Sequence, residues 1–126
     1  QYKPLQELYA KHKAAGLSIL AFPSTSFNQE DVDAATVSDF CTKENGITFP
    51  LFAIDVVSDG KPKPGDVAQP VYKWLYAQPG QSTPVAWNFE KFLISKDGKL
   101  VKRWLSAVSP DLNGEIDLAI QAELAK

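Results

Sequence analysis

The side chains best suited to chemistry in this chain are its single cysteine, Cys41, and its single histidine, His12. A thiolate is a nucleophile and a metal ligand, and an imidazole moves protons near neutral pH. Cys41 is nevertheless predicted to be a small core residue of a helix over residues 31–43. His12 is predicted to be a charge partner at the C-terminal end of a helix over residues 3–15. One histidine, one cysteine and scattered carboxylates do not make a ligand set, so we predict no metal and no cofactor.

Two other groups of residues have polar chemistry. Lys99, Lys102 and Arg103 form a small basic cluster that could attract an anionic thiol such as glutathione, although a solvated edge of a hairpin is the simpler interpretation. Trp87 and Asn88, judged by residue type alone, are a buried aromatic side chain followed by the polar start of a strand.

Composition limits the class of protein. The chain has 126 residues, 44% hydrophobic and 22% charged, which is typical of one folded domain spanning residues 1–126. A net charge of −2 does not favour binding to nucleic acid. No apolar run approaches the roughly 20 residues of a membrane span, and no targeting segment is evident, so we expect a soluble protein of unassigned compartment. The chain opens at Gln1 without a methionine, which suggests a processed or incomplete chain.

Helices and buried strands alternate in the first half of the chain. Leu5, Leu8 and His12 share one face of the first predicted helix, and Gly16 can end it. An apolar run over residues 17–22 predicts a buried strand, and residues 47–54 a short extended segment. A loop over residues 58–69 leads to a short helix that begins at Pro70.

A hairpin organises the second half. Residues 87–94 and 100–104 are rich in aromatic and β-branched side chains, and Asp97-Gly98 between them is a strong signal for a tight turn. Ser109-Pro110 predicts the start of the last helix, which should bury Leu112, Ile116 and Ile120. The resulting order, α-β-α-β-α-β-β-α, predicts an α/β fold of the thioredoxin-like kind without its first strand.

Several strings in the sequence resemble the glutathione peroxidase family, in family order and over nearly the whole chain. The most specific is Trp87-Asn88-Phe89-Glu90-Lys91-Phe92-Leu93. The others are individually weak but collinear, and they cover residues 2–9, 16–23, 40–42, 48–52, 72–75, 97–99, 101–103 and 109–110.

The resemblance implies a thioredoxin-fold thiol or selenol peroxidase. In that family a cysteine or selenocysteine attacks the peroxide bond, becomes a sulfenic or selenenic acid, and is reduced by glutathione or thioredoxin. A Gln, a Trp and an Asn surround the reacting atom. Trp87 and Asn88 match the last two.

Two features depart from the family pattern. The peroxidatic residue would lie ahead of Gln1, and Ser26 occupies the Gln position within Phe22-Pro23-Ser24-Thr25-Ser26-Phe27. A serine hydroxyl is shorter than the amide arm, so we do not expect it to reach the same atom. Cys41 falls one residue ahead of the resolving cysteine of thioredoxin-dependent members. The chain as given is therefore predicted to be inactive.

Two functions remain open. The first is a degenerate peroxidase domain kept as a structural or interaction module, such as a subunit of a larger assembly with a protein partner. The second is an active peroxidase of hydrogen peroxide or lipid hydroperoxides, whose cysteine lies in an N-terminal part not given. Glutathione or thioredoxin would be partners only in the second case.

The fold also predicts a vacant central position in the sheet. The absent strand would lie between residues 17–22 and residues 89–94, which would then stand two strand spacings, about 10 Å, apart. We expect upstream residues, another chain or a larger complex to fill this position. Trp74, Phe92 and Ile120 are predicted to lie in the core.

Overall fold

The computed structural model describes residues 1–27, 42 and 46–126. In this part of the chain the elements are α1 (Tyr2–His12), the short 3-10 helix η1 (Lys13–Ala15), α3 (Pro70–Tyr76), β1 (Lys91–Ile94), β2 (Leu100–Trp104) and α4 (Glu115–Leu124). Cys41 and all of the helix expected over residues 31–43 except Thr42 lie outside the described residues.

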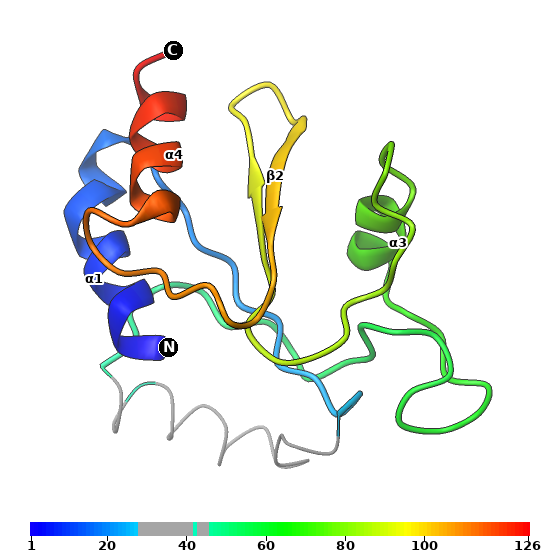
Figure 1. Cartoon of the computed structure of the whole chain (residues 1–126). Coiled ribbons are helices and arrows are strands. Elements are labelled where there is room, and N and C mark those ends of the chain that lie inside the picture. Colours follow the sequence, from blue (N-terminus) through cyan, green and yellow to red (C-terminus); the bar gives the residue numbers. More distant parts are fainter. Residues whose placement is uncertain (28–41, 43–45) are drawn as a thin grey trace.

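The hairpin stands between the pair of helices α1 and α4 and the single helix α3 (Figure 1). α1 and α4 lie side by side on one flank, joined by a 2.6 Å contact between His12 Nε2 and Asp117 Oδ1. α3 lies on the other flank. Leu93 packs toward α1 and α4, whereas the ring of its neighbour Phe92 meets Tyr72 of α3 edge-on. The two faces of β1 therefore contact different helices, as alternation along a strand requires.

The hairpin is shorter than the sequence predicts. β1 pairs with β2 in antiparallel register from Lys91 opposite Trp104 to Ile94 opposite Leu100, with an irregularity after Leu93. Gly98 adopts a φ of 84° in the connecting turn, which agrees with the predicted Asp-Gly signal. The strand expected from Trp87 starts only at Lys91, because residues 87–89 form a turn instead.

Helix boundaries also differ from expectation. α1 gives way to η1 after His12, and Gly16 ends this region with a φ of 115°. α4 begins at Glu115 and not at Ser109, because Asn113 adopts a left-handed φ of 64° that interrupts any earlier helix. Leu112 thus lies outside the helix and is exposed, contrary to the prediction, while Ile116 and Ile120 are buried as predicted.

The two expected strands in the first half are extended but barely paired. Ala21 and Leu51 form a single parallel bridge, and the only ladder among the described residues joins β1 to β2. Residues 17–22 and β1 do not pair with each other in this part of the chain.

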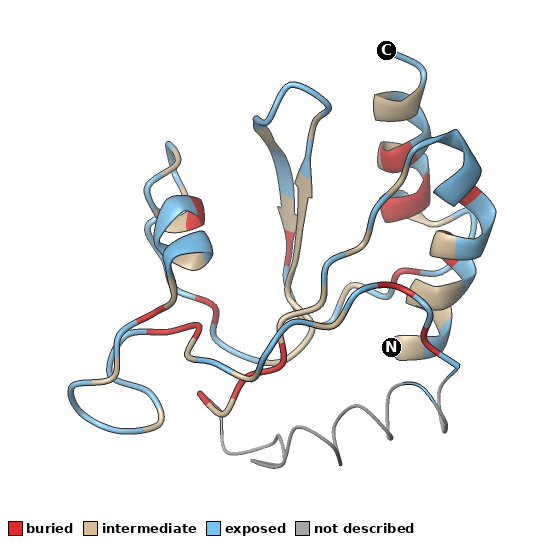
Figure 2. Ribbon diagram, turned by 180° about the vertical axis from the view of Figure 1, so that it is seen from behind, coloured by how far each residue is buried: buried red, intermediate tan, exposed pale blue. Residues whose placement is uncertain are grey.

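Among the described residues, the core consists of separate clusters. Leu8, Trp104, Ile116 and Ile120 make one, between α1, α4 and the hairpin, and Ile47 and Phe49 make another beneath α1. Figure 2 shows buried residues in separate parts of the molecule. The prediction that Trp74 is buried is wrong, since this side chain on α3 is 42% exposed, and Phe92 is only half-buried. The loop over residues 58–69 contributes the buried Ser58 and Ala68.

Candidate functional site

Trp87 and Asn88 lie in a tight turn just before β1. Phe89 completes the turn with a φ of 59°, a left-handed conformation that is uncommon for a residue with a side chain. Trp87 is half exposed. Among the described residues, no hydrogen bond engages the indole N–H of Trp87 or the side-chain amide of Asn88. By contrast, the indole of Trp104 donates to Glu115 Oε2 at 3.0 Å.

An almost buried ion pair holds this turn. Glu90 Oε1 accepts a hydrogen bond from the Ala86 N–H at 2.7 Å, and Glu90 Oε2 accepts from Arg103 Nε and Nη2 at 2.9 and 2.7 Å. Arg103 Nη1 donates to the Thr83 carbonyl at 2.7 Å. The Arg103 and Glu90 side chains are only 10% and 2% exposed. Glu90 therefore fixes both ends of the turn to β2 and sets the direction in which Trp87 and Asn88 point.

Aromatic contacts bring other segments to the same place. The Trp87 ring lies 5.8 Å from that of Phe27, and the Phe89 ring lies 5.0 Å from that of Tyr2 in an edge-on arrangement. The segment of residues 22–27, which carries Ser26, and the first turn of α1 thus both meet the Trp87 turn.

Ser26 itself does not face this site. Its side chain is buried, and its hydroxyl contacts Ser24 Oγ at 3.0 Å and accepts from the Val57 N–H at 3.1 Å. The hydroxyl therefore ties residues 24–26 to residues 57–58. That Ser26 does not take the place of the longer amide side chain stays a prediction.

A large apolar cavity of about 920 Å³ opens beside the turn. Residues 17–24 form one wall and residues 87–96 the opposite wall, so Trp87 and Asn88 line one end of it. We call this cavity the groove.

Burial along the groove shifts the pKa values of two ionisable side chains, Lys91 and Tyr72. Burial lowers the pKa of Lys91 to about 8, although the neighbouring Glu90 carboxylate opposes the change. The Lys91 ammonium donates to the Val108 carbonyl at 2.6 Å. Burial, and then Tyr76 and Glu90, raise the pKa of Tyr72 well above its usual range. Tyr72 therefore stays neutral and acts as an apolar wall.

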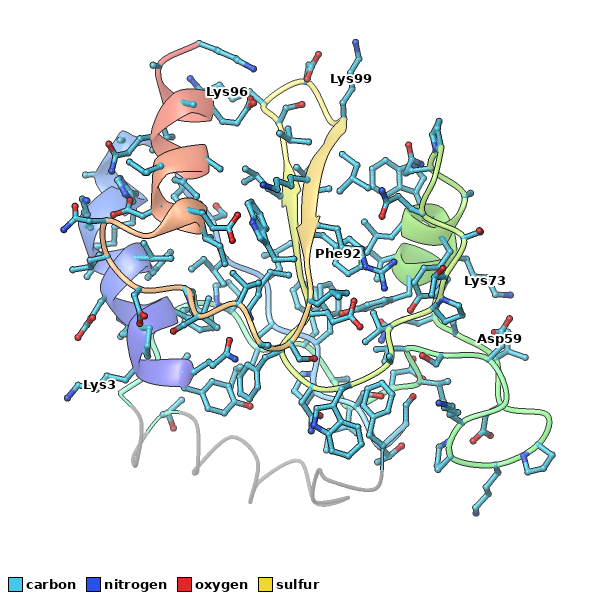
Figure 3. All side chains as sticks on the ribbon, in the orientation of Figure 1. Lys3, Asp59, Lys73, Phe92, Lys96 and Lys99 are labelled. Atoms are coloured by element: carbon cyan, nitrogen blue, oxygen red, sulfur yellow. The ribbon has the colours of Figure 1, made fainter. Side chains whose placement is uncertain are left out.

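The other candidate residues are placed apart from this turn. His12 is buried and paired with Asp117, so its charge partner is a side chain of α4. The predicted basic cluster is divided, because Arg103 is directed to Glu90, Lys102 to Glu115 at 3.3 Å, and Lys99 lies exposed at the hairpin tip (Figure 3). The sequence analysis did not identify Glu90 and Arg103 as supports of the turn. The available signal was their opposite charges within the two segments predicted to form a hairpin.

Within the described residues, no three or more His, Cys, Asp or Glu side chains are placed to hold a metal ion. None of the helices in those residues is both long and apolar enough to cross a membrane.

Comparison with known proteins identifies the family. The sequence model of the family described as "Glutathione peroxidase" matches residues 1–76. The glutathione peroxidase-like peroxiredoxin GPX5 of Chlamydomonas reinhardtii is 40% identical over 126 residues, covering 97% of this chain and 74% of that protein. This chain belongs to the glutathione peroxidase family.

Two further relatives agree. The hydroperoxy fatty acid reductase gpx1 of Synechocystis is 37% identical over 120 residues, covering 88% of this chain and 68% of that protein. The solved structure titled "Crystal structure of Trgpx in apo form" superposes with a TM-score of 0.68 at 29% identity, covering 100% of this chain and 71% of that one. The fold is thioredoxin-like, and the predicted fold class is confirmed.

Proposed function

We propose that this protein reduces hydroperoxides by thiol chemistry, with Trp87 and Asn88 as hydrogen-bond donors to the reacting sulfur and oxygen atoms. The observation that carries the proposal is the state of these two donors. Both line the same end of the groove, and neither has a hydrogen-bond partner in the described residues.

The chemistry needs such donors. A cysteine thiolate attacks one peroxide oxygen, the O–O bond breaks, and the sulfur becomes a sulfenic acid while the other oxygen leaves as an alkoxide that takes up a proton. Negative charge passes from sulfur to the leaving oxygen. Fixed N–H donors that face this charge lower the barrier without having to reorganise.

Apolar walls favour an organic hydroperoxide over a charged substrate, and one relative is named as a reductase of hydroperoxy fatty acids. The reductant is a low-molecular thiol or a protein dithiol. With Arg103 turned toward Glu90, the basic cluster offers little support for anchoring glutathione.

The nucleophile is the remaining requirement. The chain has one cysteine, Cys41, which we do not assign to this role, so we propose that the 126 residues by themselves are inactive. The test is consumption of hydrogen peroxide and of a fatty acid hydroperoxide, with glutathione and separately with thioredoxin, by the chain and by Cys41→Ser. Turnover by the chain would contradict this proposal, and its loss in Cys41→Ser would make Cys41 the nucleophile.

The roles of Trp87 and Asn88 are tested in the natural polypeptide that contains this chain. We expect Trp87→Phe and Asn88→Ala each to lower kcat/KM by about 10²-fold, the usual effect of removing one donor. Leu118→Ala, at an exposed side chain of α4 that does not line the groove, is the control and should have little effect.

A degenerate structural or interaction module is the second candidate. The observation that favours it is that the Ser26 hydroxyl is hydrogen-bonded to Ser24 and to the Val57 N–H. The third donor position of the family therefore has no side chain that reaches the site. A natural polypeptide that shows no turnover with either reductant would support this second function.

A further inference from the structure

The segment that leads into the Trp87 turn is held by side chains. Residues 83–86 connect α3 to the base of the hairpin (Figure 1) and belong to no helix or strand. In the part of the chain that the structure describes, no main-chain hydrogen bond engages them. Four of their main-chain groups are bound by side chains instead: the Thr83 carbonyl by Arg103, the Val85 N–H by Tyr76, the Val85 carbonyl by Ser58 and the Ala86 N–H by Glu90.

Tyr76 and Ser58 bind both main-chain groups of one residue, Val85. The Val85 N–H donates to the Tyr76 hydroxyl at 3.0 Å, and the Val85 carbonyl accepts from the Ser58 hydroxyl at 2.7 Å. Val85 and Ser58 are both buried. Because a buried main-chain group without a partner is costly, removal of either hydroxyl should favour a shift of this segment.

The Tyr76 hydroxyl also joins the segment to the loop that carries Ser58. It donates to the carbonyl of Val57, and the Val57 N–H donates to Ser26 Oγ at 3.1 Å. Burial raises the pKa of Tyr76, so its hydroxyl keeps the proton that it donates near neutral pH. One side chain at the C-terminal end of α3 therefore fixes two segments that are distant in the sequence.

The direction of Trp87 depends on this anchor. Trp87 lies two residues after Val85, and the N–H of the intervening Ala86 is held by Glu90. Glu90 supports the turn from the side of β2, whereas the two hydroxyls support it from the side of α3. A hydrogen-bond donor contributes fully to a transition state only when it is held close to the productive geometry.

We propose that Tyr76 and Ser58 are positioning residues that hold Trp87 and its turn in the orientation needed for hydroperoxide reduction. The two hydroxyls act through the main chain of Val85 and contact neither the substrate nor the reacting sulfur. This role rests on the proposed function.

The test measures turnover in the natural polypeptide together with the NMR signal of the Trp87 indole N–H. We expect Tyr76→Phe and Ser58→Ala each to lower kcat/KM by about 10-fold, well below the Tm of the variants, and to shift the Trp87 signal. Tyr9→Phe is the matched control and should change neither quantity. In the described residues the Tyr9 hydroxyl has no hydrogen bond, and Tyr9 does not line the groove.

A double-mutant cycle separates positioning from a general loss of stability. If Tyr76 acts through the indole, Tyr76→Phe should lower kcat/KM by a smaller factor in a Trp87→Phe background than in the parent protein. Equal factors in the two backgrounds would overturn the positioning role. A lower Tm with an unshifted Trp87 signal and unchanged kcat/KM would also overturn it and make Tyr76 a structural residue.

Failure of the proposed function gives a different pattern. If Trp87→Phe left kcat/KM unchanged, the indole would have no part in the reaction, and the proposed function would be overturned together with the positioning role. If Trp87→Phe lowered kcat/KM while Tyr76→Phe and Ser58→Ala did not, only the positioning role would be wrong.

Discussion

Asp117 shows how one buried charge joins two helices. Its side chain is fully buried, and it accepts hydrogen bonds from Lys11 Nζ at 2.8 Å and from the Asn113 N–H at 2.8 Å, while His12 Nε2 lies 2.6 Å from its other oxygen. Burial alone would raise the pKa of Asp117, but the hydrogen bonds, with that from Lys11 the largest, hold it well below the usual range. The charged form is therefore favoured in the folded protein.

This arrangement predicts the direction of a pH effect. A carboxyl whose pKa is lower in the folded state stabilises the fold above its unfolded pKa of about 3.9, and this stabilisation is lost as the pH falls toward the folded value. We expect Asp117→Asn to lower the free energy of unfolding by about 3 kcal/mol at pH 7. The variant should also show a flatter decline below about pH 4, measured by urea unfolding across pH. Parallel pH profiles for the two proteins would contradict this account.

The Glu90–Arg103 pair makes a second prediction, at the candidate site. Glu90→Gln leaves the Arg103 guanidinium largely buried without its counter-charge, so we expect a loss of about 3–5 kcal/mol and a shift of the Trp87 indole N–H signal in NMR spectra. Lys99→Gln, at an exposed pair with Asp97, is the control and should cost less than about 0.5 kcal/mol. An unmoved Trp87 signal would show that the turn does not depend on Glu90.

Among the elements, the hairpin turn is the most direct link between sequence and structure. Gly98 has a φ of 84°, and nothing within 4 Å would meet an added Cβ, so only the backbone conformation penalises a larger residue there. We expect Gly98→Ala to lower the free energy of unfolding by about 1–2 kcal/mol, measured by chemical unfolding. Gly98→Asn should cost less because asparagine tolerates this conformation. Equal effects of the two substitutions would point to a lost contact.

Short sequence signals predicted the helix ends and turns that depend only on neighbouring residues. Pro70 at the start of α3, Gly16 after η1 and Asp97-Gly98 in the hairpin turn are short-range features, and the structure confirms each. The motif Trp87-Asn88 lines the groove, and its role in a functional site stays a prediction.

The remainder depends on contacts between distant residues. The Phe89 turn is held by Arg103, and the burial of Ser26 depends on Val57; neither partner is indicated by neighbouring sequence. Trp74 was expected to be buried because helix periodicity places it on the apolar face of α3. Periodicity does not show whether another element covers that face, and Trp74 is exposed.

For the molecule as a whole, the open groove has a thermodynamic consequence. A domain of this size normally has one contiguous core. In the part of the chain that the structure describes, the cluster around Leu8 and Trp104 is separate from that around Ile47 and Phe49. The groove lies between residues 17–24 and residues 87–96, and its lining is mostly apolar. The chain should therefore expose an apolar surface in the groove that binds small apolar probes.

The dye 8-anilinonaphthalene-1-sulfonate, which binds exposed apolar surface, tests this expectation. Leu20 lies in the groove wall and is 53% exposed, whereas Leu118, at 57%, lies on α4 and does not line the groove. Leu20→Asp should weaken binding of the anionic dye severalfold, since it removes an apolar contact and adds a like charge, while Leu118→Asp should leave binding nearly unchanged. Neither side chain is buried, so both variants should retain the far-ultraviolet circular dichroism of the parent chain. If both substitutions weakened binding equally, the dye would be binding to exposed apolar surface in general. The groove would then not be the principal binding site for the dye.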